Sequence, residues 1–161
     1  MENTTVYYFT YGSNMDEDDL GIWCKKQMLP FPQWEFRGTA YLKNYKLVFN
    51  YFSESRSGGA ANLVVLDESI VYGLLFKVNE ADLDTIRKKE GFPRYYEEIL
   101  VTVINNEKSI SDVITFKVVN SREKQQHQPP TKHYMGLILK NAVKYDFPLG
   151  YIESLKSIVT F

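Results

Sequence analysis

VYYFTYGSN, residues 6–14, is the stretch of sequence that decides the fold. Its first six residues are all β-branched or aromatic, which predicts a strand over residues 6–11. The Gly-Ser-Asn that follows stops the strand, because these residue types are typical of turns. Four carboxylates at residues 16–19 come next, and we predict that they open a helix running to about Gln27. Acidic side chains in a first helical turn are stabilised by the helix dipole, which favours this interpretation over a metal site.

The chain beyond this helix contains further strand and turn signals. Short runs of β-branched and aromatic residues, bounded by polar or glycine-rich segments, are typical of strands. They predict strands at residues 45–52, 60–66, 70–78, 99–104 and 113–119. We expect Asp-Glu-Ser at residues 67–69 to form a hairpin between two of these strands, and Asn105-Asn106 to form the turn between the last two.

Helical segments interrupt and follow these strands. Residue types and caps predict helices at residues 80–90, 132–145 and 151–159, and loops at residues 28–34, 53–59 and 120–131. Asn79 and Thr131 are suitable N-terminal caps, and Gly91 is a suitable left-handed stop. This order is not the strict alternation of a doubly wound sheet. It predicts an α+β domain with a mixed or antiparallel sheet, which could be closed into a barrel.

The overall composition is that of one ordinary globular unit. The sequence has 161 residues, 44% of them hydrophobic and 24% charged, which predicts a single domain over residues 1–161. The net charge of −1 argues against a general nucleic-acid or anionic-membrane binder. No apolar run approaches the ~20 residues that a membrane span needs. The polar start MENTT lacks the pattern of a signal peptide, so we expect a cytoplasmic protein.

Residues that bind metals or form disulfides are scarce. Cys24 is the one cysteine, which excludes an internal disulfide and a cysteine-rich zinc site. His127 and His133 lie six residues apart in a proline-containing stretch, which is not a metal-ligand pattern. Aromatic residues are abundant at 15% of the chain. We expect most of them in the core and a minority of tyrosines in a polar pocket.

Glu90 is the most informative charged position. It lies four residues after Ile86 and seven after Leu83, so it shares the apolar face of the helix over residues 80–90. The same spacing directs Lys88 and Lys89 elsewhere. Burial raises a carboxylate pKa and suits the group to act as a base near neutral pH. The alternative is that the helix end frays into solvent, or that Glu90 pairs with a neighbouring arginine, Arg87 or Arg94.

The turn at residues 12–14 is a second candidate. A strand that ends in Gly-Ser-Asn just before a helix brings several backbone N–H groups together, and such groups can bind a carboxylate or an oxyanion. A plain strand-to-helix turn is the alternative. Ser13 lacks the G-x-S-x-G context of a hydrolase nucleophile. The chain also contains neither a P-loop nor a G-x-G-x-x-G motif.

Several short motifs, taken in order, resemble the γ-glutamylcyclotransferase-like family. The strand that ends in Tyr-Gly-Ser-Asn-Met, residues 11–15, is similar to the opening motif of that family. Further similar segments are residues 37–42 with 45–49, 59–63, 71–76, Glu90-Gly91 with Tyr96, residues 129–131 with Tyr134, and residues 146–151. Each motif is short, but their order and spacing cover essentially the whole chain.

This resemblance implies an α+β fold, namely a mixed β-barrel with surrounding helices and one cavity. It implies a reaction without metal or organic cofactor, in which the free α-amine of a γ-glutamyl amide attacks its own γ-carbonyl. The products are 5-oxoproline and a released amine or amino acid. By the same resemblance, Glu90 is the catalytic proton shuttle. The substrate-binding residues would be Tyr11, Gly12, Ser13, Asn14, Met15, Tyr96 and Tyr134.

The sequence departs from the family pattern in three places. Ile86-Arg87 stands where the family often has Leu-Asp, and we expect altered helix contacts rather than lost activity. Thr131 replaces a serine and keeps the hydroxyl group. The segment 91–96 is one residue shorter than in some members, which leaves the size of the substrate open.

Three functions remain compatible with the residues. The first is a cyclotransferase acting on a small-molecule γ-glutamyl amino acid, peptide or amine. The second is a cyclotransferase acting on a γ-glutamylated lysine side chain or biosynthetic intermediate. The third is a binding module for a small acidic metabolite. We expect no nucleic-acid or membrane partner, whereas exposed aromatics are compatible with a homodimer. The glycine-containing loop at residues 53–59 either closes over the pocket or simply connects two strands.

Overall fold

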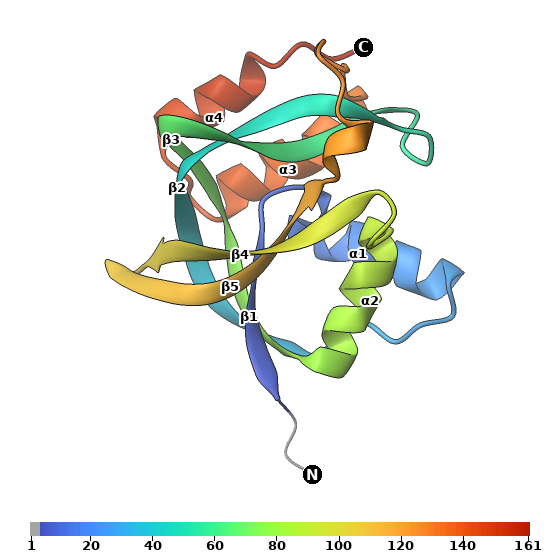
Figure 1. The fold of residues 1–161 in the computed structure, drawn as a ribbon, viewed down its shortest axis with the longest axis vertical. Coiled ribbons are helices and arrows are strands. Elements are labelled where there is room, and N and C mark those ends of the chain that lie inside the picture. Colours follow the sequence, from blue (N-terminus) through green and yellow to red (C-terminus); the bar gives the residue numbers. More distant parts are fainter. Residues whose placement is uncertain (1–3) are drawn as a thin grey trace.

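Within residues 4–161, which the computed structural model describes, five strands close into a barrel (Figure 1). The strands are β1 (Thr5–Thr10), β2 (Trp34–Ser53), β3 (Gly58–Asn79), β4 (Tyr96–Asn105) and β5 (Lys108–Val118). Their order around the barrel is β1-β3-β2-β4-β5. Neighbouring strands are antiparallel except β1 and β5, which pair in parallel with Tyr7 opposite Val113. The expected mixed barrel is therefore confirmed.

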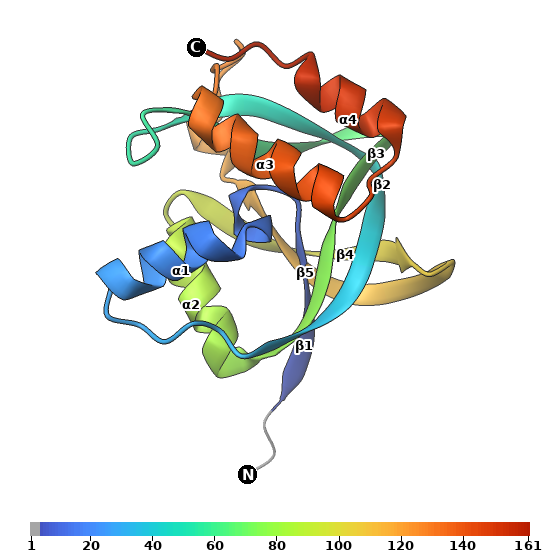
Figure 2. The same cartoon turned by 180° about the vertical axis from the view of Figure 1, so that it is seen from behind.

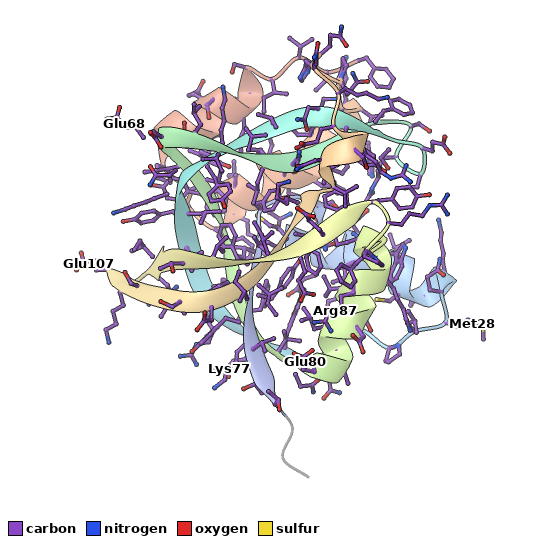
Figure 3. The ribbon with its side chains drawn as sticks, in the orientation of Figure 1. Met28, Glu68, Lys77, Glu80, Arg87 and Glu107 are labelled. Carbon is purple, nitrogen blue, oxygen red and sulfur yellow. The ribbon has the colours of Figure 1, made fainter. Side chains whose placement is uncertain are left out.

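β2 and β3 are much longer than the sequence predicted. They span 20 and 22 residues and pair with each other over most of their length. The expected hairpin at residues 67–69 is wrong, because β3 continues through it. Asn44 and Glu68 both adopt positive φ, and the Glu68 N–H donates to Asn44 Oδ1 at 3.1 Å. The two strands therefore bend together at a bulge, and Figure 3 places Glu68 at this bend.

The hairpins lie where the strands do end. Residues 54–57 connect β2 to β3, so the expected loop at residues 53–59 is shorter than predicted. Trp34 belongs to β2 rather than to the preceding loop, and its ring stacks on Phe76 with centroids 3.9 Å apart. The turn predicted at Asn105-Asn106 lies one residue later, because Asn105 is the last residue of β4 and pairs with Lys108. Asn106 and Glu107 adopt positive φ at the tip of the β4–β5 hairpin, where Figure 3 labels Glu107.

The helices follow the predicted caps closely. They are α1 (Glu17–Lys26), α2 (Glu80–Glu90), α3 (Lys132–Lys144) and α4 (Leu149–Lys156), with short 3-10 turns η1 (Ser13–Met15) and η2 (Asn120–Arg122). Asp16, Asn79 and Thr131 each accept a backbone N–H at the start of α1, α2 and α3. α4 begins and ends earlier than the predicted 151–159, because Pro148 already has the backbone conformation of a helix N-cap.

The helices cover the outside of the barrel. Figure 2 shows α3 and α4 over β2 and β3, with α1 and α2 beside each other below them. The core contains buried side chains from all five strands, among them Phe9, Leu42, Leu63, Val103 and Val113. No helix formed by residues 4–161 is both long and apolar enough to cross a membrane.

Arg87, which departs from the family pattern, ties α2 to the barrel. Its guanidinium contacts Glu80 at 3.0 Å and Asp84 at 2.6 Å on α2, and Glu98 at 2.6 Å on β4. Figure 3 labels Arg87 and Glu80 on this helix. The Arg87 side chain is 20% exposed, so its charge is partly shielded from solvent.

Replacing Arg87 with Met should remove this network while keeping most of the side-chain volume. We expect the free energy of unfolding to fall by about 1 kcal/mol, because a partly buried set of ion pairs contributes more than one exposed pair. Urea unfolding at low and at 1 M NaCl checks this. The loss should shrink at high salt, and a loss of equal size at both salt concentrations would contradict an electrostatic cause.

Candidate active site

The side chain of Glu90 turns inward at the end of α2. Leu83 and Ile86, on the same helix face, have no exposed surface. Glu90 Oε1 accepts a hydrogen bond of 2.8 Å from Asn14 Nδ2, which belongs to η1. The predicted face is therefore correct. Glu90 neither frays into solvent nor pairs with Arg87, whose contacts lie on the other side of the helix.

Glu90 lines two neighbouring hollows. The inner cavity has a volume of about 30 Å³, about one water molecule, and lies inside the end of the barrel next to η1. The outer cleft has a volume of about 390 Å³ and opens between α1, α2 and the β2–β3 hairpin. The two share four lining residues, which are Ser13, Glu90, Tyr96 and Tyr134. Glu90 thus faces both.

The pKa of Glu90 is raised. Burial of the carboxylate is the largest cause, and the charges of Lys89 and Arg56 and the hydrogen bond from Asn14 partly oppose it. A carboxylate balanced in this way accepts and returns a proton more readily near neutral pH than an exposed glutamate does.

The turn before α1 presents unused backbone donors. Among residues 4–161, the N–H groups of Gly12, Ser13 and Asn14 donate to no protein acceptor. The N–H of Met15 donates to Gly12 O at 3.1 Å. Met15 is buried and lines neither hollow, so it differs from the other predicted substrate-binding residues and has a packing role. Gly12, Ser13 and Asn14 lie at the inner cavity as expected.

Three predicted tyrosines surround the inner cavity. Tyr96 Oη donates to Ala61 O at 2.8 Å, and Tyr134 Oη accepts from Ala61 N at 3.0 Å. Tyr11 Oη donates to Phe116 O. Tyr134 therefore keeps its hydroxyl proton as a donor, with the Ser13 side chain within hydrogen-bonding reach, whereas Tyr11 and Tyr96 offer lone pairs.

All three phenols remain protonated at neutral pH. Burial is the largest cause, raising the pKa of Tyr134 to about 12 and the pKa values of Tyr11 and Tyr96 as well.

Sequence reasoning missed three charged residues of the outer cleft. Lys89 was expected to point away, but its side chain is 7% exposed and its Nζ donates to Asn14 Oδ1. Asp19 on α1 lies 3.4 Å from Lys89 Nζ and accepts two hydrogen bonds, at 2.8 and 3.0 Å, from Arg56. Helical periodicity places the Cα–Cβ bond, not the end of a four-carbon side chain, so no signal in the sequence identified Lys89.

The hairpin with Arg56 forms one wall of the outer cleft. Arg56 lies over the Tyr134 ring, 5.3 Å from its centroid, and is fixed by its two bonds to Asp19. Gly59 packs directly against the backbone of the 120–131 loop, and its N–H donates to Pro129 O. The glycines at residues 58 and 59 therefore permit close packing in this structure.

A larger cavity of about 840 Å³ lies between β2, residues 124–127 and α4, but no Asp or Glu among residues 4–161 lines it. His127 belongs to that cavity and bonds to Val159 O through Nε2 at 2.8 Å. No group of three or more His, Cys, Asp or Glu side chains in the described chain could hold a metal ion.

Comparison with known proteins gives consistent results. The sequence profile of the AIG2-like family matches residues 70–155, more than half of the chain. A γ-glutamylcyclotransferase of Bos taurus is 29% identical over 162 residues, covering 98% of this chain and 80% of its own. A γ-glutamylcyclotransferase of Homo sapiens is 28% identical with the same coverage. A solved structure described as γ-glutamyl cyclotransferase has a TM-score of 0.83 at 26% identity, covering 98% of this chain and 90% of the other.

Proposed function

This chain belongs to the AIG2-like family, and we propose that it catalyses the γ-glutamylcyclotransferase reaction with Glu90 as the proton shuttle. Relatives with that name match nearly its whole length, which places it among enzymes of this class. The observation that carries the proposal is the Glu90 carboxylate, held by Asn14 where it lines both the inner cavity and the outer cleft.

The proposed reaction needs one group that both takes and gives a proton. The α-ammonium group of the substrate first transfers a proton to the Glu90 carboxylate. The resulting amine forms a bond to the γ-carbonyl carbon, and the carbonyl oxygen becomes an oxyanion. The bond between that carbon and the leaving nitrogen then breaks while Glu90 returns the proton to this nitrogen. Glu90 next passes the second proton of the ring nitrogen to the released amine, so the products are a neutral lactam and an ammonium group. Ring closure is intramolecular, so positioning of the substrate supplies much of the rate enhancement.

The surroundings of Glu90 match the charges of a γ-glutamyl group. The free N–H groups of Gly12, Ser13 and Asn14 suit the α-carboxylate or the oxyanion. The Tyr134 hydroxyl supplies a further donor to the oxyanion. Tyr11 and Tyr96 offer oxygen lone pairs to the α-ammonium group. Among the described residues, the three backbone N–H groups have no protein acceptor, so they are open to a ligand.

The outer cleft is the proposed site of the leaving group. The inner cavity alone is too small for a γ-glutamyl amide, so the substrate would occupy the two hollows together. Both signs of charge line the outer cleft, with Arg56 and Lys26 on the basic side and Asp19 and Glu90 on the acidic side. Such a lining suits a zwitterionic leaving amino acid better than an apolar amine.

Incubation of the purified protein with γ-glutamyl-alanine, glutathione and the γ-glutamyl-lysine isomers should release 5-oxoproline from at least one compound. Mass spectrometry of 5-oxoproline and of the released amine measures this directly. We expect γ-glutamyl-alanine to react faster than a γ-glutamyl amide of a simple alkylamine, because only the former leaves a zwitterion. The opposite order would contradict the proposed leaving-group site.

No release from any compound by a folded protein would contradict the proposed activity. A rise in melting temperature with γ-glutamyl-alanine, without product, would then identify a binding module in place of an enzyme.

A further inference from the structure

Lys89 is a nearly buried cation at the centre of the site. Its side chain is 7% exposed, and its Nζ contacts come from two other elements. They are Asn14 Oδ1, Asp19 Oδ2 at 3.4 Å and Ser13 Oγ at 3.5 Å. Burying an ammonium group is costly unless it is paired and hydrogen-bonded. Here the pairing residue is Asp19, and the hydrogen bond with the shortest distance goes to Asn14 rather than to Asp19.

The contact with Asn14 fixes which way its amide group faces. An ammonium group only donates hydrogen bonds, so the atom of Asn14 that faces Lys89 must be the carbonyl oxygen. An ionised carboxylate only accepts, so the atom that faces Glu90 must be the amide nitrogen. That nitrogen donates to Glu90 Oε1 at 2.8 Å and lies 3.1 Å from Tyr8 Oη. Lys89 and Glu90 thus bind opposite ends of one amide.

We propose that Lys89 is a positioning residue, which fixes the orientation of the Asn14 amide and so holds the Glu90 carboxylate ionised and in place to receive the substrate proton. This inference rests on the proposed function for its catalytic consequence. Although Lys89 directly precedes Glu90 in the sequence, it acts on Glu90 through Asn14, which belongs to η1. Lys89 does not act directly on the substrate.

The positive charge of Lys89 also favours the ionised form of Glu90. Among the groups that oppose the burial of Glu90 and lower its pKa, the charge of Lys89 has the largest effect. Burial lowers the pKa of Lys89 itself, while the charges of Glu90 and Asp19 raise it. The charged or titratable groups that line the two hollows around this pair are Tyr8, Tyr11, Asp19, Lys26, Arg56, Tyr96 and Tyr134.

The sign of the pH effect follows from these charges. Without the Lys89 cation, the raised pKa of Glu90 should rise further, so Glu90 would lose its proton only at a higher pH. Activity that needs ionised Glu90 would then appear at a higher pH, and the acid limb of the kcat profile would move upward. A residue with only a packing role would lower activity equally at every pH.

Replacing Lys89 with Met tests the proposal, with Lys88→Met as the matched control, since Lys88 is the exposed neighbour on the same helix. We expect kcat for the best γ-glutamyl substrate to fall about 10- to 100-fold, KM to change less than about 3-fold, and the acid limb to move upward. Lys88→Met should match the wild type. A rise in KM alone would assign Lys89 to substrate binding, and an unmoved acid limb would also overturn the proposal.

A measurement without substrate separates this inference from the proposed activity. In protein with ¹³C-labelled glutamate, NMR titration should show a higher Glu90 pKa in Lys89→Met than in the wild type, even if no substrate is ever found. An unchanged Glu90 pKa would overturn the inference while leaving the cyclotransferase proposal intact. If Lys89→Met does not fold, Lys89→Gln serves for the Glu90 pKa and the acid limb, because it keeps an N–H donor for Asn14 and removes the charge.

Discussion

Replacing Glu90 with Gln should lower kcat for 5-oxoproline release by about 10³-fold or more, because the amide cannot carry the proton from the α-ammonium group to the leaving nitrogen. The substitution is nearly isosteric. The amide oxygen can still accept the hydrogen bond that Asn14 Nδ2 donates to Glu90 at 2.8 Å. KM should therefore change much less than kcat. Single-substrate kinetics by mass spectrometry measure both.

The same variant should be more stable than the wild type at neutral pH. The pKa of Glu90 is raised in the folded protein, with burial as the largest cause. The folded wild type thus binds the Glu90 proton more tightly than the unfolded chain does, and it loses stability as pH rises through the raised pKa. The Gln side chain does not titrate, so the stability difference should be small at low pH and grow as pH rises. Urea unfolding across this pH range measures the difference.

Glu97→Gln is the matched control for both effects. Glu97 is a half-exposed carboxylate on β4, and its contact is an ion pair with Lys117 at 3.5 Å. This variant should retain full activity and near-wild-type stability. Glu90→Gln with wild-type kcat would remove Glu90 from the proposed mechanism, and Glu90→Gln that is less stable at neutral pH would contradict the buried, ionised carboxylate.

Replacing Gly59 with Ala should destabilise the barrel severely. A Cβ atom at this position would lie 1.8 Å from the carbonyl oxygen and 2.8 Å from the carbonyl carbon of Gln128. Both are backbone atoms, so no side-chain rotation relieves the overlap, and the 120–131 loop would have to leave β3. We expect the free energy of unfolding to fall by about 3 kcal/mol or more. The melting temperature should fall by roughly 6–12 °C for a chain of this length.

Gly136→Ala is the same chemical change as Gly59→Ala, but it should raise the stability of the protein. Gly136 lies on the exposed side of α3, and an added Cβ would meet nothing within 4 Å. Alanine is the better helix former, so stability should rise by about 0.5–1 kcal/mol. Thermal denaturation of the two variants tests both predictions, a lower melting temperature for Gly59→Ala and a higher one for Gly136→Ala. A Gly59→Ala protein as stable as the wild type would mean that the loop does not pack on β3 in solution.

Local sequence signals were most successful where one short segment contains all the information. The helix over residues 80–90 has the predicted bounds, with Asn79 as its cap and Gly91 in the left-handed conformation. The strand that precedes the Gly-Ser-Asn turn is also confirmed. Caps and stops depend on hydrogen bonds within a few residues, so their chemistry is visible in the sequence.

The same reasoning failed for β2 and β3. The polar Asp-Glu-Ser at residues 67–69 has the composition of a hairpin, yet β3 continues through it and bends there at a bulge. The partner strand decides between a hairpin and a bulge, because Asn44 bends β2 at the same level and accepts the N–H of Glu68. A contact between residues that are 24 positions apart leaves no local signal.

The sequence by itself determined the caps, the strand-to-helix turn and the inward face of Glu90, because periodicity and capping are local properties of the backbone. Tertiary structure alone decided the closure of the barrel, the length of β2 and β3, and the contacts of Lys89 with Asn14 and Asp19 and of Arg56 with Asp19. Those features depend on where separate elements meet and on how far a long charged side chain reaches. The residues that neighbour a position in the sequence determine neither of these.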